Sequence, residues 1–107
     1  MFQVRAKKSL GQHFLKDESI AHRIAESLEN YPTLPVLEVG PGTGMLTRQL
    51  LELGRDLTVV EIDRESVAYL KEHYPALKGR ILEQDFLQMD LTTLYNGNFC
   101  LIGNYPY

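Results

Sequence analysis

The chain has 107 residues, enough for one domain, and its 44% of apolar residues is ordinary for a globular protein. That composition excludes wholesale disorder, and a single cysteine, Cys100, excludes an internal disulfide and a cysteine-rich metal finger. No stretch reaches the roughly 18 apolar residues that cross a bilayer, and the first residues do not resemble a secretory signal. We therefore expect no membrane partner, no metal and a cytoplasmic location, where thiols stay reduced.

The formal net charge of -3 is divided unevenly along the chain. Residues 1–25 contain five basic and two acidic residues, whereas residues 26–107 contain six basic and twelve acidic residues. Residues 1–16 show no periodicity, so we expect a basic arm there that favours an anionic partner. A solvated, flexible arm without a partner is the alternative.

Helices and strands are predicted to alternate along the rest of the chain. The first helix is expected over residues 18–29, capped by Asp17, because apolar side chains recur there every four residues. Two further helices are predicted, one that stops at Gly54 and one that starts after Asp63. Short apolar runs predict four strands, at 36–39, 57–62, 80–83 and 99–102, with one helical turn at 90–95.

This order of elements predicts a parallel sheet with helices on both faces. Ligands bind to such sheets at the carboxyl ends of the strands. Those ends carry glycine or polar residues at four places: 40–44, 61–63, 85–86 and 104–107. A functional site is therefore expected at this edge.

The glycine-rich loop at 40–44, Gly-Pro-Gly-Thr-Gly, joins a buried strand to a helix. Glycines let a ligand approach bare main chain, and the helix N-terminus offers unpaired N–H groups to a carboxylate or phosphate. A purely structural turn is the alternative. A dinucleotide fingerprint would need glycine or alanine where Met45 stands, and no Walker lysine follows Gly44, so both of those motifs are excluded.

Two acidic residues follow strands at positions suited to a nucleoside. Glu61 comes 21 residues after Gly40 and can accept hydrogen bonds from both ribose hydroxyls. Asp85 can accept a hydrogen bond from the exocyclic amine of adenine. The structural alternatives are a surface acid for Glu61 and a turn residue for Asp85, and we interpret Asp63 as a helix cap.

The segment Asn104-Tyr105-Pro106-Tyr107 follows the last strand with an amide, a constrained backbone and an aromatic ring. The Asn104 side-chain oxygen and a neighbouring main-chain carbonyl can accept hydrogen bonds from an amino group, and an aromatic face can stack on a base. A simple turn is the alternative, because asparagine and proline both favour turns. The place of the segment directly after a buried strand favours a functional role.

With these residues the chain resembles the small-subunit (16S) ribosomal RNA adenine N6-dimethyltransferases, relatives of the erythromycin-resistance rRNA methyltransferases. The resemblance runs from about Lys8 to Tyr107, which is nearly all of the chain. It is carried by ordered motifs at matching intervals: Leu10-Gly11-Gln12-His13-Phe14-Leu15, Glu38-Val39-Gly40-Pro41-Gly42-Thr43-Gly44, Val60-Glu61-Ile62-Asp63, Gln84-Asp85 and Gly103-Asn104-Tyr105-Pro106-Tyr107.

The resemblance implies S-adenosyl-L-methionine as the methyl donor and N6 of rRNA adenines as the acceptor. In this family an N-terminal segment closes over the cofactor, a glycine loop binds its methionine part, one acid binds its ribose and another reads its adenine. Gln12, His13 and Leu15 match the segment that closes over the cofactor, and Gly40 and Gly42 match the glycine loop. Glu61 matches the acid that binds the ribose, and Asp85 matches the acid that reads the adenine. The resemblance also implies that Asn104 contacts the cofactor. Many members have asparagine in place of His13, which can still donate a hydrogen bond.

The catalytic residues implied by the resemblance are Asn104, Tyr105, Pro106 and Tyr107. Asn104 Oδ1 and the Tyr105 carbonyl would accept hydrogen bonds from the adenine amine, and Tyr107 would stack on the target base, so catalysis is chiefly positioning. Many members have leucine in place of Tyr105, but a backbone carbonyl does not depend on the side chain. The target base must leave its stack to reach the site.

The resemblance also implies a fold and an incomplete chain. The fold is the Rossmann-like class I fold of S-adenosylmethionine-dependent methyltransferases, truncated here after the fourth strand. We expect residues 1–16 to form the arm and residues 17–107 a partial methyltransferase domain, with further strands and a C-terminal helical domain absent. The strand at 99–103 would then be an uncovered edge, open to self-association.

These inferences predict that the parent protein is an enzyme that dimethylates adenines in small-subunit rRNA during ribosome biogenesis. They also predict that this chain is a fragment of that enzyme which binds the cofactor but is inactive. The basic residues Arg5, Lys7 and Lys8 would contact phosphates of the rRNA or of a pre-ribosomal particle. One alternative is a non-catalytic pre-ribosome-binding factor on the same fold. Another is an NAD-dependent oxidoreductase, which Met45 and the segment 104–107 disfavour.

Overall fold

Strands and helices alternate along the chain, as the sequence predicts. The computed structural model describes residues 2–4, 18–42 and 44–103. Its strands are β1 (Phe2–Val4), β2 (Val36–Val39), β3 (Leu57–Val60), β4 (Ile81–Leu82) and β5 (Cys100–Gly103). Its α-helices are α2 (Glu18–Glu26), α3 (Met45–Glu52) and α4 (Arg64–His73), and its 3₁₀ helices are η1 (Ser27–Asn30), η2 (Pro75–Leu77), η3 (Phe86–Gln88) and η4 (Leu91–Thr93).

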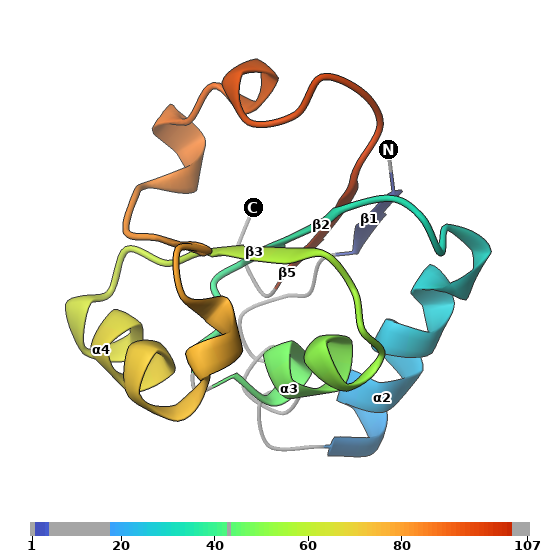
Figure 1. Cartoon of the computed structure of the whole chain (residues 1–107), viewed down its shortest axis with the longest axis horizontal. Helices are drawn as coiled ribbons and strands as arrows, with labels where there is room; N and C mark the ends of the chain where they lie inside the picture. The colour runs from blue at the N-terminus through green and yellow to red at the C-terminus, as the bar shows by residue number, and fades with distance from the viewer. Residues whose placement is uncertain (1, 5–17, 43, 104–107) are drawn as a thin grey trace.

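All the described strands lie in one parallel sheet, in the order β1-β5-β2-β3-β4 (Figure 1). In β2, Val36 is in register with Leu57 of β3 and with Cys100 of β5. Because the strands are parallel, their carboxyl ends share one edge, and the loops that follow β2, β3 and β4 meet there. The parallel sheet confirms the predicted architecture and brings the loops that carry the predicted site residues Gly40, Glu61 and Asp85 to one edge.

β1 departs from the prediction for residues 1–16, which we expected to form an arm. Phe2–Val4 pairs with Cys100–Ile102, so part of this segment belongs to the sheet. β5 therefore pairs on both sides, with β1 and with β2, and the expectation of an uncovered edge at 99–103 is wrong. A strand of three residues is too short for a periodic pattern, and its partner lies at the other end of the chain, so no local signal reveals it.

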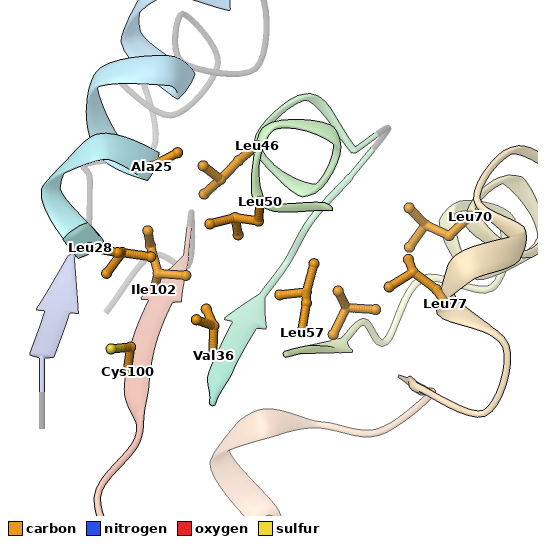
Figure 2. Packing of buried hydrophobic residues seen from close by; sticks show 11 residues of the cluster. Ala25, Leu28, Val36, Leu46, Leu50, Leu57, Leu70, Leu77, Cys100 and Ile102 are labelled. Carbon is orange, nitrogen blue, oxygen red and sulfur yellow. The ribbon is translucent and has the colours of Figure 1, made fainter. Parts of the chain in front are cut away.

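The helices α2, α3 and α4 cover one face of the sheet (Figures 1 and 2). Ala25 of α2 and buried leucines from α3, α4, η1 and η2 pack against the strands, and burial of each leucine contributes about 1.5–3 kcal/mol. The residues of this core include Leu28, Leu46, Leu50, Leu70 and Leu77 from the helices and Val36, Leu57, Val59 and Ile102 from the strands. Leu53 shares the apolar spacing of α3 but follows the end of that helix and is exposed.

The opposite face of the sheet is covered by residues 86–99 (Figure 1). On this face the structure has only the short 3₁₀ helices η3 and η4 among its described residues, where the sequence predicts helices on both faces of the sheet. Asp85 accepts a hydrogen bond from Leu87 N–H and Asp90 from Thr92 N–H, both at 3.0 Å, and each aspartate thereby starts a single turn. The turn predicted at 90–95 is η4, whereas η3 was not predicted.

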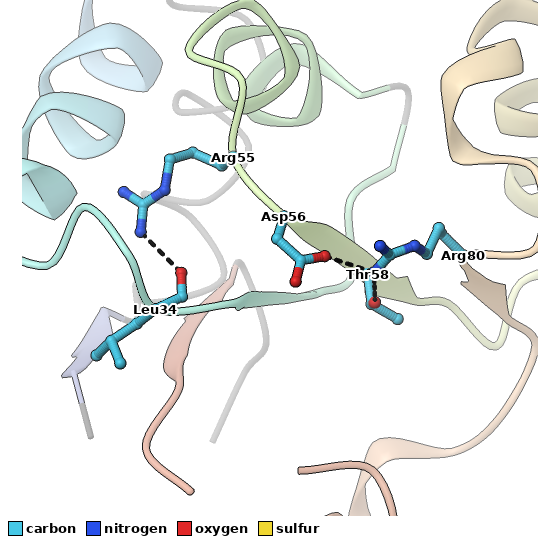
Figure 3. A network of polar contacts seen from close by, with 5 residues as sticks. All are labelled: Leu34, Arg55, Asp56, Thr58 and Arg80. Atoms are coloured by element: carbon cyan, nitrogen blue, oxygen red, sulfur yellow. Dashed lines mark hydrogen bonds and ion pairs between the residues drawn. The ribbon is translucent and has the colours of Figure 1, made fainter.

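Polar contacts of two arginines fix the connections at the amino end of the sheet (Figure 3). Arg80 forms an ion pair with Asp56 at 2.6 Å and donates to Thr58 Oγ1 at 3.3 Å, which ties the start of β4 to β3. Arg55 donates to three backbone carbonyl oxygens, those of Leu28 (3.1 Å), Tyr31 (2.6 Å) and Leu34 (3.0 Å). One guanidinium group therefore satisfies carbonyls at the end of η1 and in the connection to β2.

Among the helices described, none combines the length and the apolar character needed to cross a membrane. The described part of the chain also contains no cluster of three histidine, cysteine, aspartate or glutamate side chains that could hold a metal ion.

Candidate functional site

The loops after β2, β3 and β4 form a small pocket at the carboxyl edge of the sheet. Its lining comes from the ends of β2 and β3, the residues after β3 and the segment before η3, namely Val39, Gly40, Val60, Glu61, Ile62, Gln84, Asp85 and Phe86. Gly40, Glu61 and Asp85, which the sequence predicts to bind a ligand, thus meet in one place. The parallel topology accounts for this, because it gathers the carboxyl ends of strands that lie far apart in the sequence.

The glycine loop after β2 has backbone angles that favour glycine. Gly40 and Gly42 have φ angles of 69° and 59°, in the left-handed region where other residues are strained. Gly40 N–H donates to the carbonyl oxygen of Val60 at 2.9 Å, which holds the loop against the end of β3. The loop therefore presents bare main chain beside the pocket, as the sequence analysis expects.

Glu61 joins the glycine loop to the loop after β3. Its Oε1 accepts from Gly42 N–H at 3.3 Å and its Oε2 accepts from Asp63 N–H at 3.0 Å. The side chain is only 9% exposed, so it is not the surface acid of the structural alternative. Each carboxylate oxygen can accept more than one hydrogen bond, so Glu61 keeps acceptor capacity for hydroxyl groups of a ligand.

Asp85 lines the pocket from the segment after β4, which β3 separates from β2 in the sheet, and it has a structural role as well. Its Oδ1 caps η3 by accepting from Leu87 N–H, so the turn-residue alternative is correct for one of its oxygens. No hydrogen bond joins Oδ2 to another described residue, and this oxygen is available to a ligand donor. Ile62 lines the same pocket with an apolar side chain that is 64% exposed.

Asp63 is the N-cap of α4, which confirms its interpretation as a helix cap. Its Oδ2 accepts from Ser66 N–H at 2.9 Å and from Ser66 Oγ at 2.8 Å. These two hydrogen bonds hold the pKa of Asp63 below its usual range. Of the two acids that follow β3, Glu61 is therefore the one that lines the pocket.

Glu38 lies in β2, two residues before Gly40, and the sequence analysis did not predict it as a site residue. It is 2% exposed, and its Oε1 accepts a hydrogen bond from Thr47 Oγ1 of α3 at 2.5 Å. Burial raises the pKa of Glu38 to about 7, the Thr47 hydroxyl opposes this shift, and the Glu61 carboxylate adds to it. An acid within a strand that is otherwise apolar, two residues before a glycine loop, is the sequence signal that could have identified it.

Several predicted site residues lie outside the described part of the chain. They are the cofactor contacts Gln12, His13 and Leu15, the basic residues Arg5, Lys7 and Lys8, and the segment Asn104, Tyr105, Pro106 and Tyr107. β5 ends at Gly103, in register with Val39, so the described chain stops beside the glycine loop. The roles of these residues stay predictions.

Comparison with known proteins shows close relatives over the whole chain. The family described as Ribosomal RNA adenine dimethylase matches residues 3–107. The Ribosomal RNA small subunit methyltransferase A of Parabacteroides distasonis is 62% identical over 104 residues, covering 97% of this chain and 39% of the relative. The protein of the same name from Porphyromonas gingivalis is 58% identical over 109 residues, covering 100% of this chain and 42% of the relative. The chain thus spans about two fifths of the length of these relatives.

The structure is also similar to a solved one. The crystal structure of the 23S rRNA methyltransferase ErmE matches with a TM-score of 0.66 and 37% sequence identity, over 85% of this chain and 36% of that chain. This similarity and the parallel sheet confirm the predicted Rossmann-like methyltransferase fold. Since the family match extends over residues 3–107, the chain belongs to the ribosomal RNA adenine dimethylase family.

Proposed function

We propose that the protein containing this chain transfers methyl groups from S-adenosyl-L-methionine to N6 of adenines in small-subunit ribosomal RNA, and that this chain supplies the cofactor site. The observation that carries the proposal is the hydrogen bond between Gly42 N–H and Glu61. It sets an acid suited to ribose hydroxyls against a loop that a ligand can approach closely. The family and the names of the relatives support rRNA as the substrate.

The described residues fit this cofactor. Glu61 would hold the ribose hydroxyls, Asp85 Oδ2 would accept from the adenine amine, and Gly40 and Gly42 would lie against the methionine part. The exposed side chain of Ile62 offers an apolar surface to the adenine ring. When bound, the cofactor supplies an electrophilic methyl group on its sulfonium. Further contacts are proposed for residues of the N-terminal segment and of the last loop, namely Gln12, His13, Leu15 and Asn104.

The segment after β5 is proposed to hold the acceptor adenine. Asn104 Oδ1 and the Tyr105 carbonyl would accept the two hydrogen bonds of the N6 amine, and Pro106 would restrict the backbone between Tyr105 and Tyr107. Stacking of the base on Tyr107 would contribute about 1–3 kcal/mol. The register of Gly103 with Val39 supports this assignment, because it brings the start of the segment beside the glycine loop.

The RNA is proposed to contact the N-terminal segment as well. Arg5, Lys7 and Lys8 would neutralise rRNA phosphates, so binding would weaken as salt increases. With β1 assigned to the sheet, the arm is proposed to comprise residues 5–16, and the partial methyltransferase domain to comprise β1 and residues 17–107. The protein would act in the cytoplasm, on the small ribosomal subunit or its precursor.

The test is methyl transfer from radiolabelled S-adenosyl-L-methionine to small-subunit rRNA that lacks the modification, catalysed by the full-length protein. Asn104→Ala should lower the rate about 100-fold, because the amine loses the acceptor that orients it. Asn98→Ala is the matched control, since Asn98 is an exposed asparagine just before β5, and it should leave the rate unchanged.

Equal rates for wild type and Asn104→Ala would contradict the catalytic role. RNA binding by the wild type without any methyl transfer would favour the non-catalytic pre-ribosome-binding factor instead.

A further inference from the structure

Tyr74 lies where α4 ends, and its backbone is fixed from both sides. Its N–H donates to the carbonyl oxygen of Leu70 at 2.9 Å, and its own carbonyl oxygen accepts from Leu77 N–H at 2.9 Å. Tyr74 thereby closes α4 and begins η2. Its half-buried ring packs against the core on the helical face of the sheet. The side chain therefore starts from a defined point in the fold.

The ring of Tyr74 occupies the space beside Gly44, the residue that caps α3 at the end of the glycine loop. A Cβ at Gly44 would lie 2.7 Å from Cε2 of the ring and 2.9 Å from its Cζ and its hydroxyl oxygen, which is closer than non-bonded atoms approach. The Tyr74 hydroxyl donates to the carbonyl oxygen of Gly44 at 3.2 Å. The contact is thus both steric and polar.

Hydrogen bonds hold the glycine loop at its start, in its middle and at its end. Gly40 and Gly42 are held through their N–H groups by residues at the end of β3. Gly44 is held through its carbonyl oxygen, which accepts from Tyr74 and also from Arg48 N–H at 2.8 Å, the first helical hydrogen bond of α3. Tyr74 therefore acts at the point where the loop becomes a helix, whose first N–H groups are suited to a ligand carboxylate.

The Tyr74 hydroxyl is not needed to satisfy the carbonyl group that it contacts. The Gly44 carbonyl oxygen already accepts from Arg48 N–H, so it would stay hydrogen-bonded beside a phenylalanine. Tyr74 also lines a hollow of ≈ 400 Å³, together with residues that include Lys71 and Ile81. A ring without the hydroxyl would be free to turn towards this space, whereas the hydrogen bond keeps the ring over Gly44.

We propose that Tyr74 is a positioning residue for cofactor binding: its ring and hydroxyl hold Gly44, and with it the end of the glycine loop, in the form that receives S-adenosyl-L-methionine. This inference rests on the proposed function, which puts the methionine part of the cofactor against the loop. Tyr74 acts through Gly44, because it lies outside the lining of the pocket at the carboxyl edge. A loop that is already held in its binding form costs less to order when the ligand binds.

A positioning role has a kinetic signature that a structural role lacks. A loop that is held less well spends part of its time in other forms, and the apparent affinity falls in proportion. Once the cofactor is bound, the loop has the same form in wild type and variant. Loss of the Tyr74 hydroxyl should therefore raise the Kd and the KM of S-adenosyl-L-methionine and leave kcat at saturating cofactor unchanged. A purely structural role would lower the free energy of unfolding and leave the Kd of the folded protein unchanged.

Calorimetric titration of the full-length protein with S-adenosyl-L-methionine measures the Kd, and methyl transfer to rRNA measures KM and kcat. Tyr74→Phe keeps the ring and removes the hydroxyl, and it should raise the Kd about fivefold. Tyr74→Leu removes the ring as well and should raise the Kd at least about tenfold. Tyr69→Phe is the matched control, because Tyr69 is an exposed tyrosine of α4, and it should leave the Kd unchanged. Urea denaturation of each variant measures its stability separately.

Amide hydrogen exchange followed by NMR tests the same inference without measuring an affinity. Arg48 N–H donates to the carbonyl oxygen that Tyr74 holds. In the wild type this amide should be protected from exchange before the cofactor binds, and binding should change its exchange rate little. In Tyr74→Phe it should exchange at least about fivefold faster in the free protein and regain the wild-type rate when the cofactor is bound.

Equal Kd values for Tyr74→Phe and Tyr69→Phe, or a lower kcat at an unchanged Kd, would overturn the inference and leave the proposed function intact. The same Arg48 exchange rate in free wild type and free Tyr74→Phe would overturn it as well. These outcomes need only Tyr74→Phe, so they decide the inference even where Tyr74→Leu does not fold. Failure of the wild type to bind S-adenosyl-L-methionine would overturn the proposed function itself.

Discussion

Gly103 has no side chain, and the backbone of β2 occupies the space where one would lie. A Cβ at this position would overlap the carbonyl oxygen of Val39 and would lie 3.1 Å from the Val39 Cβ. Both strands are buried and paired on both sides, so neither can move away easily. The close approach of β2 and β5 therefore depends on a single glycine, directly before the proposed catalytic segment.

Gly103→Ala should lower the free energy of unfolding by about 1–3 kcal/mol, because the added methyl group forces the two strands apart. Urea denaturation of the full-length protein measures this change. Gly97→Ala is the matched control, since nothing lies within 4 Å of a Cβ there, and it should change the stability by less than about 0.5 kcal/mol. Equal stabilities for the two variants would show that the strands have room for a side chain at position 103.

At the scale of single elements, Arg55 compensates for the way in which α2 ends. The helix predicted over 18–29 becomes a 3₁₀ helix, η1, from Ser27 onward, and Arg55 adds a charged donor to the carbonyl oxygens of Leu28 and Tyr31, each of which also accepts a backbone N–H. Arg55→Ala should lower the free energy of unfolding by about 1–3 kcal/mol, because three carbonyl oxygens lose a charged donor. Thermal or urea denaturation measures this, with the exposed Arg64→Ala as control. A cost no larger than that of the control would contradict the anchoring role.

The sequence predicts elements well where the signal is local, and misses them where it is not. The apolar spacing of α3 and the short run of β2 give their types and their buried faces, and the cap at Asp63 gives the start of α4. The ends of the elements are predicted less accurately. The strand expected at 57–62 ends at Val60. Glu61 therefore lies in the following loop, where its side chain turns towards Gly42. β1 carries no local signal, because its only described strand partner is β5.

At the scale of the whole molecule, the candidate site follows from topology more than from any single motif. Gly40, Glu61 and Asp85 were each weak evidence in the sequence, and the parallel sheet brings them to one pocket. Glu38 was missed because its burial and its contact with Thr47 arise only when α3 packs on β2. The second face could not be predicted in detail, because the capping aspartates start turns too short for periodicity to reveal.

The central claim is that Glu61 and the glycine loop bind S-adenosyl-L-methionine. Calorimetric titration of the full-length protein with this cofactor tests it most directly, with NAD as the competing ligand. Glu61→Ala should weaken the affinity at least about tenfold, equivalent to about 1.4 kcal/mol, whereas Glu65→Ala, at an exposed acid in the first turn of α4, should leave it unchanged. Equal affinities for the two variants, or binding of NAD in place of S-adenosyl-L-methionine, would contradict this account.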